Sequence, residues 1–236
     1  MIHGASNYTE MQKKYYEDDA SHWSTENRNP VVGSFDGHNA WKDYDDFLFK
    51  DINGDLSRKE MLDFGCGPGR NIVKYSKFFK RIDGVDISSN NIKNARIWMD
   101  KNGCADGDLF LCDGASLKEI KSEQYDIVMS TICFQHICVY DIRKSYLNDF
   151  FRVLRKGGSL TMQMGFGGKE GYAWAKYKEN ACQAKATNGY FDVSIDNVEE
   201  LKLDLIDSGF NKFVYYLRPT GPGDNHKNWI FFSASK

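Results

Sequence analysis

The chain has 236 residues, carries 31 Lys plus Arg against 33 Asp plus Glu, and is 41% hydrophobic; this composition indicates a globular protein with a sizeable core and excludes wholesale disorder. The formal charge of -2 gives no overall positive field to hold a nucleic acid. No apolar run approaches the length of a membrane span and the N-terminus lacks the apolar segment of a secretory signal, so we expect a cytoplasmic protein.

Two acidic, aromatic helical pieces are predicted within residues 1–55, near 10–21 and 40–50. Residues 56–236 form the core, where short apolar runs alternate with helical patterns. This alternation predicts β-α-β units, a parallel sheet and an α/β fold. The predicted strands are 60–65, 81–88, 108–113, 125–132 and 159–164, and the predicted helices are 69–80, one capped by Ser88 or Ser89, and 142–154.

The regular alternation breaks at residues 165–196, which we interpret as an insertion after the fifth strand with a polar helical stretch. A last helix is predicted at 197–207. Two strands follow, FNKFVYYL and NWIFFSAS, separated by a loop that is too short for a helical crossover. The final pair is therefore predicted to be antiparallel.

A glycine-rich turn, Asp63-Phe64-Gly-Cys-Gly-Pro-Gly69, stands where the first strand gives way to a helix. Glycine allows a sharp turn there and lets the backbone approach a ligand closely. A dinucleotide fingerprint starting at Gly65 needs a third glycine at position 70, where the chain has Arg70, and no G-K-[ST] follows for a P-loop. These two common nucleotide-binding motifs are therefore excluded.

An aspartate stands at the end of each of the first three core strands: Asp63, Asp86 and Asp113. Together with the D-x-G-x-G-x-G turn, the G-V-D-I-S run at 84–88 and R-V-L-R-K-G-G at 152–158, this pattern resembles the class I S-adenosylmethionine (SAM)-dependent methyltransferases over about residues 60–164. The G-C-G-P-G-R-N form further resembles members that act on small molecules. The resemblance implies a doubly wound, Rossmann-like sheet of order 3-2-1-4-5-7-6 with strand 7 antiparallel, and a helical lid in residues 1–55.

The resemblance also implies SAM as cofactor, S-adenosylhomocysteine as product, and a cofactor site at the carboxyl ends of the strands. Backbone amides of the turn would line the methionine end above Asp63, Asp86 would accept the ribose hydroxyls, and Asp113 would accept the adenine amine. Taken singly, Asp63 and Asp113 fit a helix cap or turn residue better. The expected cofactor residues are Asp63, Gly65, Cys66, Gly67, Asp86, Ile87, Asp113, Gly114, Ala115, Ile132 and, from the lid, Tyr16.

His136 follows the fourth strand in the run I-C-F-Q-H-I and is the candidate catalytic base, because imidazole titrates near neutral pH. A base assists an oxygen acceptor of high pKa and matters little for an amine or a thiolate. The alternative is that His136 only caps its loop through a backbone carbonyl.

The acceptor side is expected between the insertion and the turn joining the last two strands, with Trp174, Tyr177, Arg218 and His226 as substrate residues. The lid aromatics, Tyr16 and Trp23 among them, fit packing better than recognition, although a lid can combine both uses. The proline-containing motif of amino-DNA methyltransferases and the Pro-Cys dipeptide of cytosine methyltransferases do not occur.

The predicted function is therefore methyl transfer from SAM to an oxygen or nitrogen of a small molecule, with no DNA or membrane partner. Six cysteines without C-x-x-C spacing predict no metal site. The alternatives left open are a catalytically silent SAM-binding partner or sensor and a protein or RNA methyltransferase. The pattern does not indicate an oligomeric state.

Overall fold

The computed structural model describes residues 5–22, 43–104, 106–171, 174–181 and 192–236. The predictions made for Trp23 and for parts of the lid and the insertion lie outside these ranges. The helices are α1 (Ala5–Ser21), α2 (Asp45–Leu48), α3 (Arg70–Tyr75), α4 (Ser89–Lys101), α5 (Tyr140–Val153) and α6 (Val198–Asp207). The strands are β1 (Glu60–Phe64), β2 (Arg81–Asp86), β3 (Leu109–Leu111), β4 (Tyr125–Ser130), β5 (Leu154–Gly168), β6 (Trp174–Lys176), β7 (Asp192–Ile195), β8 (Asn211–Pro219) and β9 (His226–Ser235).

The strands form a single sheet in which β3, β2, β1, β4 and β5 are parallel neighbours in that order. Beyond β5 the sheet continues with β9 and β8, and both of these pairings are antiparallel. The predicted Rossmann-like order, with an antiparallel last strand, is therefore confirmed. The short connection from β8 to β9 explains the reversal, since a parallel crossover needs a dozen or more residues.

The insertion adds two strands to the far end of β5. Gly165 pairs with Ser194 of β7 on one side and with Trp229 of β9 on the other, so β7 continues the β4 side of β5 beyond the end of β4. The strand β6 pairs in parallel with β7. The polar helix expected in the insertion is wrong at Trp174–Lys176, where exposure alternates along an extended chain and Ala175 is buried.

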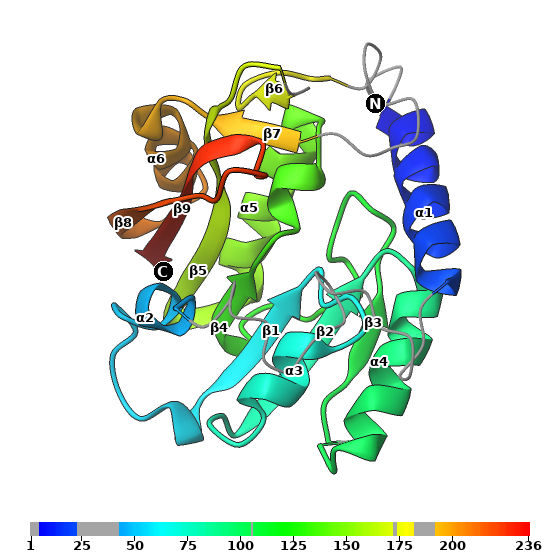
Figure 1. Ribbon diagram of the computed structural model, residues 1–236. Helices are drawn as coiled ribbons and strands as arrows, with labels where there is room; N and C mark the ends of the chain where they lie inside the picture. Colours follow the sequence, from blue (N-terminus) through cyan, green and yellow to red (C-terminus); the bar gives the residue numbers. More distant parts are fainter. Residues whose placement is uncertain (1–4, 23–42, 105, 172–173, 182–191) are drawn as a thin grey trace.

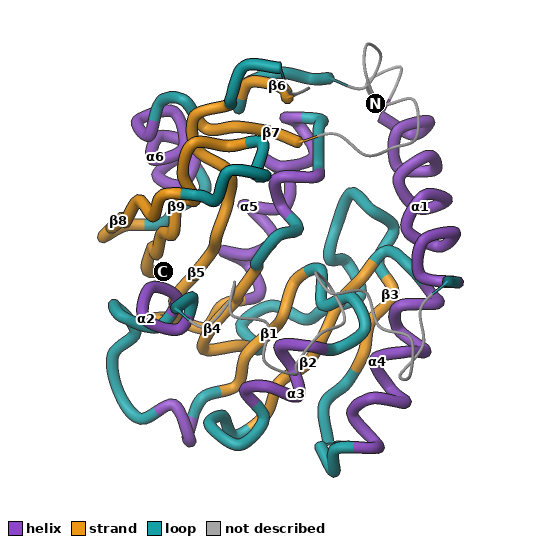
Figure 2. Tube along the Cα trace, viewed as in Figure 1, coloured by secondary structure: helices purple, strands orange, loops and turns teal. Residues whose placement is uncertain are grey.

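Helices cover both faces of the sheet (Figures 1 and 2). Alternate strand residues face two separate cores, as Met61 and Leu62 of β1 show. The core that contains Leu62 also takes Tyr8 of α1 and the inner faces of α5 and α6. The core that contains Met61 takes residues of α2, α3 and α4, so α2 packs against the sheet, with Leu48 accepting a hydrogen bond from Thr161 of β5.

Two helix starts follow from capping. Ser88 accepts a hydrogen bond from the Asn91 amide at the start of α4, and Asn197 accepts one from the Glu199 amide at the start of α6, as the predicted boundaries require. Within the described ranges, no helix is both long and apolar enough to cross a bilayer.

Candidate active site

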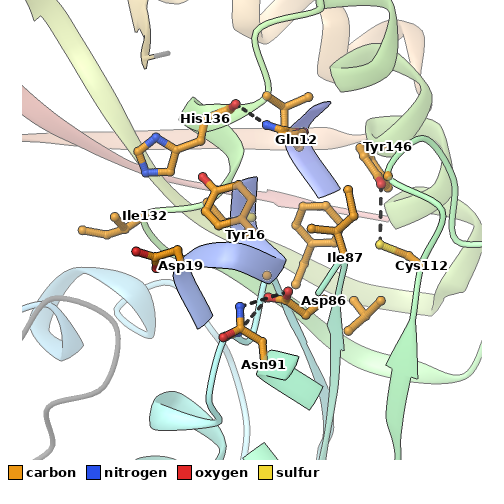
Figure 3. A pocket seen from close by; sticks show the side chains of 17 residues that line it. Gln12, Tyr16, Asp19, Asp86, Ile87, Asn91, Cys112, Ile132, His136 and Tyr146 are labelled. Carbon is orange, nitrogen blue, oxygen red and sulfur yellow. Dashed lines mark hydrogen bonds between the residues drawn. The ribbon is translucent and has the colours of Figure 1, made fainter. Parts of the chain in front are cut away.

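A pocket opens at the carboxyl edge of β1, β2 and β4, beneath α1 (Figure 3). It holds about 730 Å³ of empty space, counting the solvent at its mouth, which is within the range of small-molecule sites. Successive strands are added on one side of β1 up to β3 and on its other side from β4 onward. Open α/β sheets bind ligands at such a switch point. The lining residues are Gln12, Tyr16, Asp19, Phe64, Gly65, Gly67, Val85, Asp86, Ile87, Asn91, Cys112, Gly114, Ile132, Cys133, His136, Ile137 and Tyr146.

The glycine turn presents bare backbone to the pocket at Gly65 and Gly67, whose φ angles are 71° and 52°. An added Cβ at Gly65 would lie 2.1 Å from the Cys133 sulfur, so this position needs glycine for space as well as for φ. The amides do not face the pocket as expected: those of Gly65 and Cys66 donate to Val85 O, and that of Gly67 donates to Asp86. The turn is thus fixed to the end of β2 by its own amides. Cys66, expected at the cofactor, does not line this pocket but a smaller adjoining one.

Asp86 stands at the centre of this edge with its side chain almost fully buried. Its Oδ2 accepts the Gly67 amide at 2.9 Å, and its Oδ1 accepts the Ser88 amide at 2.8 Å and the Asn91 side chain at 3.2 Å. Burial raises its pKa, while these donors act in the opposite direction. Because Asp86 lines the pocket, the lone pair left on Oδ2 is available to a hydroxyl donor.

Asp63 lies beneath the turn, as expected, and is fully buried. Asn71 donates to its Oδ1 at 3.4 Å, whereas Oδ2 has no hydrogen-bond partner among the described residues. Burial raises the pKa of Asp63 to about 7, against the opposing effects of Asn71 and Arg70.

Asp113 does not reach the pocket. Its Oδ1 accepts the amides of Ala115 and Ser116, and its Oδ2 accepts the Ser116 hydroxyl and Lys118. These donors occupy both oxygens and, together with Lys118, hold its pKa at about 2 despite partial burial. Asp113 thus serves as a turn residue in this structure, and neither it nor Ala115, both expected at the adenine, lines the pocket, whereas Cys112 and Gly114 do.

Ile87 and Ile132 both line the pocket. Ile132 has a φ of 51°, an unusual conformation for a β-branched residue. Gln163 of β5 accepts the Ile132 amide at 2.9 Å and stabilises this backbone. Strained residues of this kind concentrate at ligand sites.

One face of α1 covers the pocket, with Gln12, Tyr16 and Asp19 directed into it (Figure 3). The helix is anchored at its C-terminal end by Glu17, which accepts hydrogen bonds from Ser88, Ser89 and Asn90 at the start of α4. The described part of the second N-terminal piece contributes no lining residue.

His136 closes the pocket from the turn after β4, and its side chain is mostly buried. Its Nδ1 lies 2.6 Å from Oδ1 of Asp192 on β7, which is itself buried. Burial favours a neutral Asp192, but His136, His226 and Asn225 outweigh that effect and lower its pKa. The turn therefore presents an imidazole paired with an ionised carboxylate.

The four residues expected to bind substrate do not line this pocket. His226 is fully buried, lies 3.5 Å from Asp192 and fills the space left by Gly165. Tyr177 is also buried and accepts a hydrogen bond from Arg143 through its carbonyl. Trp174 packs on Gly168, and Arg218 pairs with Asp43 beside the ring of Tyr44.

Sequence reasoning missed Gln12, Asn91 and Asp192. Gln12 could have been found from a helical spacing, since it shares one face of a helix with Tyr8, Tyr16 and Asp19. Asn91 could have been found because it is the third residue after the helix cap Ser88. No local pattern points to Asp192, because its contact with His136 depends on how β7 pairs with β5.

Residues 61–158 match a family model described as a methyltransferase domain. Among curated proteins, the chain is 24% identical over 180 residues to the S-adenosyl-L-methionine-dependent Diels-Alderase iliD of Neonectria sp. (strain DH2), covering 74% of this chain and 67% of that protein.

Two solved structures illustrate the likeness in fold. Phosphoethanolamine N-methyltransferase 2 of Haemonchus contortus, in complex with S-adenosyl-L-methionine, gives a TM-score of 0.63 at 19% identity over 83% of this chain and 52% of that one. This chain therefore spans about half the length of that enzyme. The [4+2]-cyclase SpnF gives a TM-score of 0.67 at 14% identity over 97% of this chain and 96% of that one.

Proposed function

We propose that this chain is a class I SAM-dependent methyltransferase that transfers a methyl group from SAM to an oxygen or nitrogen atom of a small molecule, a proposal supported by the family-model match and the fold. The observation that carries the proposal is the pocket in which the bare backbone of Gly65 and Gly67 meets the Asp86 carboxylate beneath α1.

The residues of this pocket fit an adenosyl sulfonium. Asp86 has lone-pair capacity for the ribose hydroxyls, Ile87 and Ile132 offer apolar faces to the adenine, and the glycine turn leaves room for the methionine end. The partnerless Oδ2 of Asp63 lies beneath that turn and suits an ammonium group or a bridging water. These assignments are part of the proposal.

The cover that α1 forms over the pocket supports a small-molecule acceptor. Tyr16 and Gln12 of α1 stand over it, and we propose that α1 is the lid of the domain formed by residues 56–236. The free cysteines among the described residues fit a reducing compartment, so we include a cytoplasmic location in the proposal.

Each part of the pocket has its own chemical task. When bound, the sulfonium supplies an electrophilic methyl group. The walls orient the acceptor and exclude water, which accounts for much of the acceleration in a displacement of this type. His136 is placed to accept a proton from an acceptor that must lose one.

Two experiments test the proposal. Calorimetry must show binding of SAM and S-adenosylhomocysteine to the wild-type protein. Incubation with methyl-labelled SAM and cell extract must then place label in the small-molecule fraction. Label in macromolecules would instead support a protein or RNA acceptor, and absence of cofactor binding would contradict the proposal as a whole.

A second candidate is a [4+2] cycloaddition in the same pocket with SAM bound and not consumed. It is favoured by the almost full-length likeness to the [4+2]-cyclase and by the Diels-Alderase among the curated relatives. This candidate predicts cofactor binding with label in neither fraction, and a product of the extract that has the same mass as its precursor.

A further inference from the structure

The backbone of His136 is fixed by the lid helix. The Tyr8 hydroxyl donates to the His136 carbonyl at 2.9 Å and accepts the Cys138 amide at 2.7 Å. Gln12 donates to the same carbonyl, as Figure 3 shows. The carbonyl therefore ties the loop after β4 to α1, which resembles the loop-capping alternative considered for His136 in the sequence. The imidazole ring of His136 makes a separate set of contacts.

The ring lies against Asp192, and the two oxygens of this carboxylate face different partners. Oδ1 lies 2.6 Å from Nδ1 of His136, whereas Oδ2 accepts the Asn225 amide and lies 3.5 Å from His226. His226 is in turn 3.3 Å from the Ser194 hydroxyl. Because partners on its far side hold the carboxylate, it keeps one oxygen directed at His136.

A carboxylate against Nδ1 keeps the proton of a neutral imidazole on that nitrogen and leaves the lone pair on Nε2. We infer that Asp192 is a positioning residue that holds His136 as the proton acceptor for a hydroxyl group, so that the acceptor atom of the proposed methyl transfer is oxygen. The inference rests on the proposed function and narrows it, because an amine or thiolate acceptor has little use for a fixed base.

The proton and charge balance of this step is simple. When bound, the sulfonium supplies the methyl group as its carbon–sulfur bond breaks and the acceptor oxygen bonds to that carbon, the thioether leaving with the electron pair. Nε2 of His136 takes the hydroxyl proton. The resulting imidazolium lies against the ionised Asp192, and the proton then passes to solvent when the product leaves.

The first test reads the tautomer of His136 by nitrogen-15 NMR, in the ligand-free protein and with S-adenosylhomocysteine, at a pH near 8.5 where ordinary imidazole is neutral. We expect Nδ1 to be protonated in the wild type. In Asp192→Asn the side-chain amide can donate to Nδ1 and shift the proton to Nε2. Thr161→Val is the control, since it removes a buried hydroxyl from β5 that donates to Leu48 and contacts neither Asp192 nor His136.

The second test identifies the labelled product and measures its formation. We expect an O-methyl product, and a fall in turnover of about 10²- to 10⁴-fold in Asp192→Asn with little change in KM. The Thr161→Val variant should turn over within a few-fold of the wild type.

Three results would overturn the inference: an Nε2-protonated His136 in the wild type, an Asp192→Asn variant with unchanged tautomer and turnover, or an N-methyl or S-methyl product. The wild-type tautomer decides the matter even where the variant does not fold. If the cofactor binds and the tautomer is as expected but no label is transferred, methyl transfer and the base role fail while the Asp192–His136 pairing stands.

Discussion

The Glu17 carboxylate of α1 accepts the backbone amide of Ser89, the first residue of α4, at 2.9 Å. The hydroxyls of Ser88 and Ser89 and the amide of Asn90 donate to the same carboxylate. A negative charge at a helix N-terminus is stabilised by unpaired amides and by the helix dipole. This contact joins α1 to the loop that follows Asp86, and Figure 1 shows the end of α1 next to α4.

Glu17→Gln should loosen α1. The amide side chain offers one acceptor oxygen and no charge, so we expect opening of the helix to become easier by about 1–2 kcal/mol. Hydrogen exchange of the α1 amides measures this change, and calorimetry with S-adenosylhomocysteine should show weaker binding. Glu10→Gln, an exposed position on the same helix, is the control and should change neither quantity. Equal protection of α1 in the two variants would contradict the anchoring role.

The same contact predicts an acid-dependent loss of stability. Burial opposes ionisation of Glu17, but its hydrogen bonds with Ser89, Asn90 and Ser88 prevail and lower its pKa from 4.5 to about 2. A lowered pKa means that the stabilisation is complete above about pH 4.5 and disappears as the pH falls towards 2. The thermal midpoint of the wild type should therefore exceed that of Glu17→Gln near pH 6, and the difference should shrink with acidification. A difference that stays constant down to about pH 3 would refute this explanation.

Asp86 and Asp113 should behave differently, although each follows a strand. Asp86→Asn is expected to weaken binding of S-adenosylhomocysteine by about 1.5–3 kcal/mol, the scale of hydrogen bonds to a charged group. Asp113→Asn should leave affinity within about twofold and reduce stability by about 1 kcal/mol, because it caps a turn. Calorimetry and thermal unfolding of both variants separate the two effects. A large affinity loss in Asp113→Asn would restore its adenine role.

The sequence was sufficient for the core strands and helices because each β-α unit carries its own local signals, whereas the order of the strands followed from the family resemblance. Ser88 and Asn197 mark helix starts by their side-chain chemistry, and the short loop before β9 forces an antiparallel pair. The insertion could not be predicted in the same way. The strand β6 gains its hydrogen bonds from β7, and such non-local pairing overrides the helical propensity of lysines and alanine.

The residues of the candidate site show the same contrast between local signals and non-local packing. Gly65, Gly67 and Asp86 were recognisable because a strand-to-helix turn places them at the sheet edge whatever surrounds them. The adenine contact predicted for Asp113 is not seen because the amides of Ala115 and Ser116 donate to its carboxylate. These local hydrogen bonds favour a capping role over ligand binding. The substrate contacts predicted for His226 and Tyr177 are not seen because both side chains are buried. Their burial depends on tertiary packing, which no spacing in the sequence reveals.

Gly65→Ala and Gly67→Ala form a matched pair that separates strain from steric conflict. Both positions have positive φ, so each alanine should cost about 1–2 kcal/mol of unfolding free energy. At Gly65 the new Cβ also meets the Cys133 side chain, which should add about 1–3 kcal/mol, whereas at Gly67 nothing lies within 4 Å. Denaturant unfolding measures the difference. Equal losses in the two variants would mean that Cys133 moves aside without cost.

Ile132→Gly should uncouple stability from binding. Glycine accepts the φ of 51° freely and so relieves about 1 kcal/mol of strain, while the lost side chain is only partly buried and its removal costs a similar amount. Unfolding free energy should therefore change little. Because Ile132 lines the pocket, affinity for S-adenosylhomocysteine should fall by about 1 kcal/mol or more as an apolar wall is removed. Ile97→Gly, on the exposed face of α4, is the contrasting control. It should destabilise the protein by about 1 kcal/mol without changing affinity, since it introduces glycine into a helix at a position that does not line the pocket. If Ile132→Gly destabilises the protein as much as Ile97→Gly and binds the nucleoside normally, Ile132 serves the turn and not the ligand.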